Sequence, residues 1–216
     1  MIGSGLMRRM HASVYSSRLR VLTRIVIERL NPNDRILDVG CGNGQLLKSI
    51  LDDPACPTGV TGVGVERNPR GGEPVTVIEY QGGRMPFANA SFDLVICADV
   101  LHHEEREDEL LRECARVARR AVMVKDHARD GLFAQSRISL MDWAANAPYG
   151  VVCLYRYHTL AQWRAMFTRC QLRMLKEMHP LPLYPAGWEL AFGGRLQYIA
   201  FVARDDARDD ARDDRS

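Results

Sequence analysis

The segment Asp34–Ile50, DRILDVGCGNGQLLKSI, carries three glycines spaced two residues apart: Gly40, Gly42 and Gly44. The apolar run before them reads as a buried strand, and the residues after them read as a helix that reaches Pro54. A glycine turn between a strand and a helix lets the backbone approach a ligand closely. This turn therefore predicts an α/β fold with a ligand at the end of its first strand.

Strands and helices alternate beyond this turn as far as Asp126. The pattern predicts strands at residues 60–66, 74–80, 92–99 and 120–126, and a charged amphipathic helix at residues 104–119. This order indicates parallel β-α-β units in a doubly wound sheet. The strands are continuous apolar runs, which is typical of strands covered on both faces.

The predicted domain spans residues 32–203, and its second half is less regular. The aromatic stretch at residues 127–157 is predicted to be partly helical and to form a lid or a substrate-binding insertion. A helix at residues 159–170 follows. Two strands, near residues 172–177 and 196–202, complete the pattern.

The two ends of the chain are predicted to lie outside this domain. Residues 1–31 should form a helical cap, because apolar residues follow helical spacing from about Ser13 to Leu30. A transit peptide is the alternative for this Arg-rich start. Residues 204–216 continue an ARDD repeat that has no apolar face, so this tail is predicted to be disordered.

Composition narrows the class of protein. The chain has 216 residues, enough for one large domain, and its net charge of +2 argues against a dedicated nucleic-acid binder. Its six cysteines are scattered without a C-x-x-C pair, so we expect reduced thiols and a cytoplasmic location. No apolar run approaches the ~20 residues of a membrane span.

The spacing of the glycines separates two classes of cofactor. The turn reads G-x-G-x-G, whereas a dinucleotide fold has G-x-G-x-x-G with a pyrophosphate at the helix start. Asp38 precedes the first glycine by two residues and suits a ligand that ends in a zwitterionic amino acid. Glu66 closes the second strand, where a carboxylate can accept hydrogen bonds from ribose hydroxyls. NAD enzymes also use a carboxylate at this place, so Glu66 alone does not discriminate.

Two further segments, MPFANASFDLV and ADVLHH, complete a pattern with ILDVGCGNG and Glu66. Together they resemble class I S-adenosylmethionine-dependent methyltransferases, and most closely the type 11 group that includes ubiquinone and menaquinone C-methyltransferases. The resemblance covers about residues 35–126. It implies a Rossmann-like, seven-stranded and mostly parallel sheet with a reversed last strand, and S-adenosyl-L-methionine as cofactor.

The resemblance also implies a set of cofactor-binding residues. Gly40, Cys41 and Gly42 would lie against the methionine part, with Asp38 beneath them, and Glu66 would hold the ribose. Around the adenine the implied contacts are Arg67, Met85 and Gln81, the last standing where the family often has an acid. Asp99 and Leu101 would flank the cofactor after the fourth strand.

Methyl transfer from a sulfonium needs alignment of the reacting atoms, and a base only if the acceptor holds its proton at neutral pH. The favoured candidates are His103, His127 and Asp126, which follow the fourth and fifth strands. His102 reads instead as a brace for the turn, and His158 is a further candidate base. No ligand spacing demands a metal, so none is predicted.

The expected acceptor is a small, fairly apolar molecule methylated at O or C. The aromatic stretch at residues 131–157 would cover it, with Asp142 and Asn146 able to orient a polar group, and residues 180–188 would form another wall. Core packing explains these aromatic residues equally well. We expect no nucleic-acid partner and either a monomer or a homodimer.

Three other functions are considered. An NAD-linked oxidoreductase is disfavoured by the glycine spacing and by the lack of a Tyr-x-x-x-Lys pair. A protein or RNA methyltransferase would want a basic groove or an N-P-P-Y-like tetrad, and ADVLHH is not that tetrad. A non-catalytic protein that binds S-adenosylmethionine stays open as the third alternative.

Overall fold

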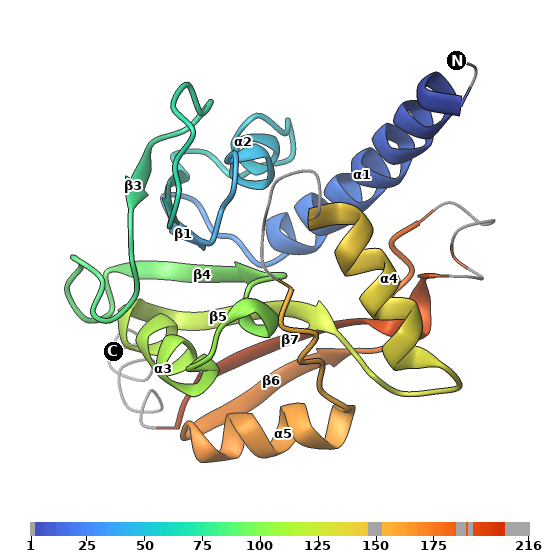
Figure 1. The fold of residues 1–216 in the computed structure, drawn as a ribbon. Coiled ribbons are helices and arrows are strands. Elements are labelled where there is room, and N and C mark those ends of the chain that lie inside the picture. Colours follow the sequence, from blue (N-terminus) through green and yellow to red (C-terminus); the bar gives the residue numbers. More distant parts are fainter. Residues whose placement is uncertain (1–2, 147–152, 185–188, 190–191, 206–216) are drawn as a thin grey trace.

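The computed structural model describes residues 3–146, 153–184, 189 and 192–205. A single seven-stranded sheet forms its centre, in the order β3-β2-β1-β4-β5-β7-β6 (Figure 1). The strands are β1 (Arg35–Val39), β2 (Thr61–Glu66), β3 (Val77–Glu79), β4 (Phe92–Ala98), β5 (Ala118–His127), β6 (Leu172–Met178) and β7 (Gln197–Arg204). β1 to β5 pair in parallel, and β7 runs antiparallel to both β5 and β6. The predicted fold class, including the reversed last strand, is confirmed.

One face of the sheet is covered by α3 (Glu107–Val117) and α5 (Leu160–Arg169) (Figure 1). Their apolar sides, which include Leu111 and Trp163, pack on alternate residues of β4, β5 and β7. Thr159, the residue before α5, caps the helix: its side chain accepts the N–H of Gln162 in a reciprocal capping box. This cap fixes where the chain turns back onto the sheet.

The other face is covered by α1 (Gly3–Ile27) and α2 (Gln45–Leu51). Leu22 and Val26 of α1 are fully buried, with Leu47 and Ile50 of α2 in the same cluster. Among the described helices, none has the length and apolar character needed to cross a bilayer.

Above the carboxyl ends of the parallel strands lies α4 (Ala134–Asn146) (Figure 1). Its buried residue Ile138 contacts Tyr157 and Leu196 in a small separate cluster. Two 3₁₀ turns, η1 (Leu101–His103) and η3 (Gly194–Leu196), lie near the same edge. α4 therefore occupies part of the region predicted as a lid.

Several predicted boundaries were wrong. α3 ends at Val117, and Ala118 already has extended backbone angles, so the residues expected to end the helix begin β5 instead. Ala118 already pairs with Phe92 of β4, and the next two residues form ion pairs, Arg119 with Asp93 and Arg120 with Asp34. α1 begins ten residues before the predicted start (13 − 3 = 10), and β3 is shorter than expected.

The packing of α1 predicts a measurable loss of stability. Leu22→Ala removes a fully buried side chain and should lower the free energy of unfolding by about 2–5 kcal/mol. Urea unfolding followed by tryptophan fluorescence measures this change, because Trp163 is buried in the core. The matched control is Leu140→Ala on α4, where the leucine is 54% exposed and the change should stay within about 0.5 kcal/mol. Equal effects in the two variants would show that α1 does not pack on the sheet.

Candidate active site

The glycine turn joins β1 to α2 with a left-handed backbone. Gly40, Gly42 and Gly44 have φ of 64°, 56° and 73°. A Cβ on Gly40 would lie 2.5 Å from Cγ2 of Val100, so only glycine lets the turn approach the end of β4 this closely. A Cβ on Gly42 would meet nothing within 4 Å. The turn thus packs tightly on one side and leaves open space on the other, as a close approach by a ligand requires.

Glu66 ties this turn to the end of β2. Its Oε2 accepts the N–H of Gly42 at 2.9 Å, and its Oε1 accepts the N–H groups of Arg67 at 2.9 Å and Asn68 at 3.2 Å. An ionised carboxylate has about four acceptor positions, so one remains for an external donor. The proposed ribose contact is compatible with this arrangement but stays a prediction.

Asp38 lies beneath the turn and is 2% exposed. Its Oδ2 has no hydrogen-bond partner among the described residues. Burial raises the pKa of Asp38 to about 7, against the opposing effect of the Arg18 charge. A buried carboxylate oxygen without a partner is costly. An ammonium group or a bound water would satisfy it, and the residues therefore fit the amino-acid end of S-adenosylmethionine.

The residues predicted to surround the adenine lie around the ends of β2 and β3. Arg67 pairs with Glu104 at 2.8 Å, and the exposed Gln81 donates its amide N–H to the carbonyl of Arg67 at 2.9 Å. Met85 is 2% exposed and belongs to the core cluster under α3, while Leu101 is fully buried in the same cluster. Cys41, also buried, contacts the backbone of β2. Their contacts with the cofactor stay predictions.

Asp99 connects three elements at the end of β4. Its Oδ2 lies 2.5 Å from Arg18 Nη2 on α1, and its Oδ1 lies 2.5 Å from Lys125 Nζ on β5. Burial would raise the pKa of Asp99, but these two cations outweigh it and hold the pKa well below its usual value. Burial also lowers the pKa of Lys125. The structure therefore places the Asp99 carboxylate between two buried cations, a role that was not predicted.

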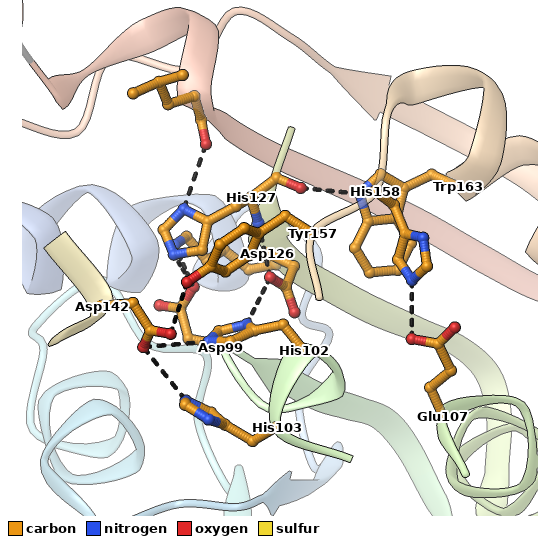
Figure 2. A network of polar contacts seen from close by, with 12 residues as sticks. Asp99, His102, His103, Glu107, Asp126, His127, Asp142, Tyr157, His158 and Trp163 are labelled. Atoms are coloured by element: carbon orange, nitrogen blue, oxygen red, sulfur yellow. Dashed lines mark hydrogen bonds and ion pairs between the residues drawn. The ribbon is translucent and has the colours of Figure 1, made fainter. Parts of the chain in front are cut away.

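Beside Asp99 lies a cluster of two histidines and two carboxylates (Figure 2). Nδ1 of His102 lies 2.7 Å from Oδ1 of Asp126, and its Nε2 lies 3.7 Å from Oδ1 of Asp142. Nε2 of His103 lies 3.6 Å from the same Asp142 oxygen. The hydroxyl of Tyr157 donates to the other oxygen, Oδ2, at 2.6 Å. We call His102, His103, Asp126, Asp142 and Tyr157 the histidine cluster.

Four parts of the fold bring the histidine cluster together. His102 and His103 lie on η1, directly after β4, whereas Asp126 is near the end of β5 and Asp142 is on α4. Tyr157 is held near β5 because the next residue, His158, forms a bridge with Ala128. The cluster therefore lies at the carboxyl edge of the sheet, next to the glycine turn, where open α/β folds bind their ligands.

The charges within the histidine cluster affect one another. Burial would lower the pKa of His102, but Asp126 and then Asp142 overcome this and raise it to about 10. For Asp142, burial would raise the pKa, yet the contacts with His102 and Tyr157 keep it below its usual value. Without a bound ligand, His102 therefore carries a proton at neutral pH between two carboxylates.

His127 packs against the histidine cluster, with its ring centroid 5.3 Å from that of His102 and 5.6 Å from that of Tyr157, whereas His158 lies outside the cluster. Nδ1 of His127 is 3.3 Å from the carbonyl oxygen of Leu196, and burial followed by the Lys125 charge lowers the His127 pKa to about 4. Its imidazole is uncharged at neutral pH. His158 lies by α3, where its Nε2 is 2.7 Å from Glu107 (Figure 2). Of the predicted catalytic residues, His103 and Asp126 are thus brought together through His102, while His127 adjoins Asp126 along the chain.

Sequence reasoning missed Arg18 and Lys125 as parts of this region, and it named Tyr157 only as one of the aromatic residues in the stretch predicted to cover the acceptor. Lys125 could have been found, because a lysine inside the apolar strand RAVMVKD needs a buried carboxylate partner. Arg18 gave no such signal, since it lies in an Arg-rich helix. Asp142 was named as a residue that could orient a polar group, and it is 4% exposed at the centre of the cluster.

Part of the predicted acceptor wall lies outside the described residues, including Tyr149, Trp188 and the side chain of Asn146. Of the aromatic residues that are described, Phe133 and Trp143 are 71% and 56% exposed. They do not contribute to the core, so packing does not account for them. A lid role for this stretch stays a prediction.

A cavity of about 580 Å³ opens at the opposite edge of the sheet, where α3 and α5 end. Its lining includes Arg112, Arg116, Gln171 and Arg204. Arg116 is engaged there by Glu113 and by the carbonyls of Phe87 and Met85. Because this cavity is far from the glycine turn and the histidine cluster, we do not assign it to the active site.

The sequence matches the methyltransferase domain family over residues 8–175. It is 37% identical over 101 residues to 27-O-demethylrifamycin SV methyltransferase of Amycolatopsis mediterranei (strain S699), a match that covers 42% of this chain and 36% of that enzyme. The chain thus spans well under half the length of the curated relatives it matches.

Solved structures share the fold at low sequence identity. A SAM-dependent methyltransferase from Thermotoga maritima aligns with a TM-score of 0.63 and 16% identity, over 90% of this chain and 91% of that chain. The 1,6-didemethyltoxoflavin-N1-methyltransferase of Burkholderia thailandensis, with bound 1,6-didemethyltoxoflavin and S-adenosylhomocysteine, aligns with a TM-score of 0.61 and 16% identity, over 94% and 87% of the two chains. The chain belongs to the methyltransferase domain family, and its domain is an S-adenosylmethionine-dependent methyltransferase domain.

Proposed function

We propose that the chain transfers the methyl group of S-adenosylmethionine to an oxygen or carbon atom of a small, fairly apolar molecule, within the type 11 group. The observation that carries this proposal is that Oδ2 of Asp38, under an open glycine turn, has no hydrogen-bond partner in the part of the chain that the structure describes. The Amycolatopsis relative supports it, because its name describes O-methylation of a small molecule.

The chain's own residues would bind and orient the cofactor. Asp38 would face the ammonium group, the backbone of Gly40 to Gly42 would lie against the amino-acid part, and Glu66 would accept a ribose hydroxyl. When bound, the cofactor supplies an electrophilic methyl group on a sulfonium, whose departure leaves a neutral thioether. Because the leaving group is already activated by its charge, alignment and exclusion of water are the main tasks left to the protein.

His103 would act as the general base that activates the acceptor. Its side chain is 18% exposed, whereas that of His102 is 2% exposed and pinned by two carboxylates. As the new bond to the methyl carbon forms, the acceptor's proton would pass to His103. Asp142, 3.6 Å away, would stabilise the imidazolium that results. Asp126 would not contact the acceptor; it would act as a positioning residue, because it holds His102 in place.

Binding of the cofactor is tested first. Isothermal titration with S-adenosylmethionine, S-adenosylhomocysteine and NAD should show saturable binding of the first two and none of NAD. The cofactor with a labelled methyl group is then incubated with a panel of phenols, aliphatic alcohols and enolisable carbon acids. Binding of NAD in place of S-adenosylmethionine would refute the proposal. A labelled protein or RNA would point to a macromolecular acceptor instead.

Loss of the Glu66 carboxylate should weaken cofactor binding. Glu66→Ala removes both the ribose acceptor and the bond to the Gly42 N–H, so the affinity for S-adenosylhomocysteine should fall by about 1–3 kcal/mol, or roughly 5- to 150-fold. Titration calorimetry measures the change. Glu109→Ala on the exposed side of α3 is the control and should bind normally. Unchanged affinity in Glu66→Ala would remove Glu66 from the site.

The buried carboxyl of Asp38 should make the stability of the cofactor-free protein depend on pH. Its pKa is raised to about 7, so the folded state holds the proton more tightly than the unfolded state. Relative to Asp38→Asn, the free energy of unfolding of the wild type should fall as the pH rises from about 4 to 7, by up to about 1.4 kcal/mol per unit, and level off above that. Urea unfolding at several pH values measures this difference. A difference that does not change with pH would show that Asp38 is not held as an uncharged acid.

His103→Ala should slow turnover while leaving cofactor affinity within about twofold. General-base catalysis contributes on the order of 10²–10⁴-fold, and the loss in kcat should fall in this range. His158→Ala is a matched control, since it also removes a histidine with a carboxylate partner, but outside the cluster. Steady-state kinetics with an acceptor from the panel measures both variants. Full activity of His103→Ala would rule out its role in acceptor activation.

A further inference from the structure

Three ligand-type atoms in the histidine cluster face a common point. The Nε2 atoms of His102 and His103 lie 3.7 Å and 3.6 Å from Oδ1 of Asp142. Both distances exceed those of a hydrogen bond. They lie close to the separation of about 3.4 Å between neighbouring ligands of a tetrahedral cation with bonds of about 2.1 Å. All three atoms lie within 4.8 Å of one another. Figure 2 shows the two imidazoles and the carboxylate converging.

Two of these three groups also have the outer partners that metal ligands usually have. Nδ1 of His102 lies 2.7 Å from the Asp126 carboxylate, an arrangement that directs Nε2 toward Asp142. The other oxygen of Asp142, Oδ2, accepts a hydrogen bond of 2.6 Å from the hydroxyl of Tyr157. A histidine backed by a carboxylate and a carboxylate backed by a hydrogen-bond donor are typical of metal sites, where they fix the ligand orientation.

The charge around this point favours a cation. Asp126 and Asp142 are 1% and 4% exposed and lie on either side of His102. The nearby cations, Arg18 and Lys125, are engaged by Asp99. Oδ2 of Asp126 adds a buried oxygen that lacks a hydrogen-bond partner among the described residues. Asp99 carries one negative charge against the two positive charges of Arg18 and Lys125, and Lys125 also interacts with Asp126. The carboxylate that a bound cation would face directly is therefore that of Asp142.

We propose that His102, His103 and Asp142 form a binding site for a divalent transition-metal cation. Two imidazoles and one carboxylate suit Zn²⁺, Fe²⁺, Co²⁺ or Mn²⁺ and leave further coordination positions open. The sequence had not suggested this site, because its ligands come from adjacent positions on η1 and from a helix 39 residues further along (142 − 103 = 39). The fold alone brings them together.

The consequence for methyl transfer rests on the proposed function. In the metal-loaded protein His103 would coordinate the cation, and only in the metal-free protein would it take the acceptor's proton. An acceptor hydroxyl on an open coordination position would release its proton to solvent water at a lower pH than the free acceptor does. The loaded protein would then favour oxygen acceptors over carbon acceptors.

Binding of Co²⁺ and Mn²⁺ to the full chain after dialysis against a chelator tests the site directly. Calorimetry should show one ion per chain, and Co²⁺ should give visible absorption. Cys153 contacts Asp142, so the Co²⁺ spectrum is also recorded for Cys153→Ser, which should be unchanged if the ligands are the two histidines and Asp142. His103→Ala and Asp142→Asn should each lower the affinity at least tenfold. Asp142→Asn keeps the shape of the side chain and its acceptor for Tyr157. Tyr157→Phe should weaken binding by on the order of 10–100-fold.

His158→Ala is the control, because its imidazole also pairs with a carboxylate at 2.7 Å but lies outside the cluster. It should bind the ions as the wild type does. Each variant is also titrated with S-adenosylhomocysteine, and unchanged affinity shows that the fold is intact. The proposal would be overturned if the wild type bound no stoichiometric ion, or if His103→Ala and Asp142→Asn bound the ions as tightly as the wild type does. The cofactor titration would in that case still support the proposed function.

Discussion

The ion pairs of Asp99 hold the active-site edge together. One carboxylate at the end of β4 contacts Arg18 of α1 and Lys125 of β5 and so joins one face of the sheet to its centre. Asp99 also has a φ of 58°, a left-handed conformation that aspartate tolerates better than most residues. The chain leaves β4 there toward Val100, which packs on the glycine turn, and toward the two histidines of η1. Both halves of the site thus depend on the same buried pairing.

These two halves meet different physical demands. On the cofactor side the backbone must approach the ligand closely, so glycines occupy positions where a Cβ would collide with neighbouring side chains. The buried carboxyl of Asp38 lies there as a partner for a positively charged group. In the histidine cluster the side chains are crowded and charged, and each is held by a neighbour from another element. Methyl transfer needs both: a fixed electrophile and a nucleophile whose proton has somewhere to go.

The parallel half of the fold could be predicted because its signals are local. Residues 35–66 carry a buried strand, a glycine turn and a second strand in consecutive sequence, and the structure reproduces them. The histidine cluster could not be assembled in this way, because Tyr157 and Asp142 reach His102 from segments whose position is set by α4 packing and by the bridge at His158. The end of α3 was misjudged because β5 begins where Ala118 pairs with Phe92 of β4, a contact that local helix propensity does not reveal.

The position of β7 bears on how the protein is made. β5 pairs with β4 on one side, but its other neighbour is β7, about 70 residues downstream (197 − 127 = 70). At the usual speed of translation, on the order of ten seconds pass between the synthesis of these two strands. During that time the nascent chain presents an apolar strand with an open edge, which is a template for pairing with other chains. A chaperone that shields this edge on the ribosome would therefore raise the yield of the native protein.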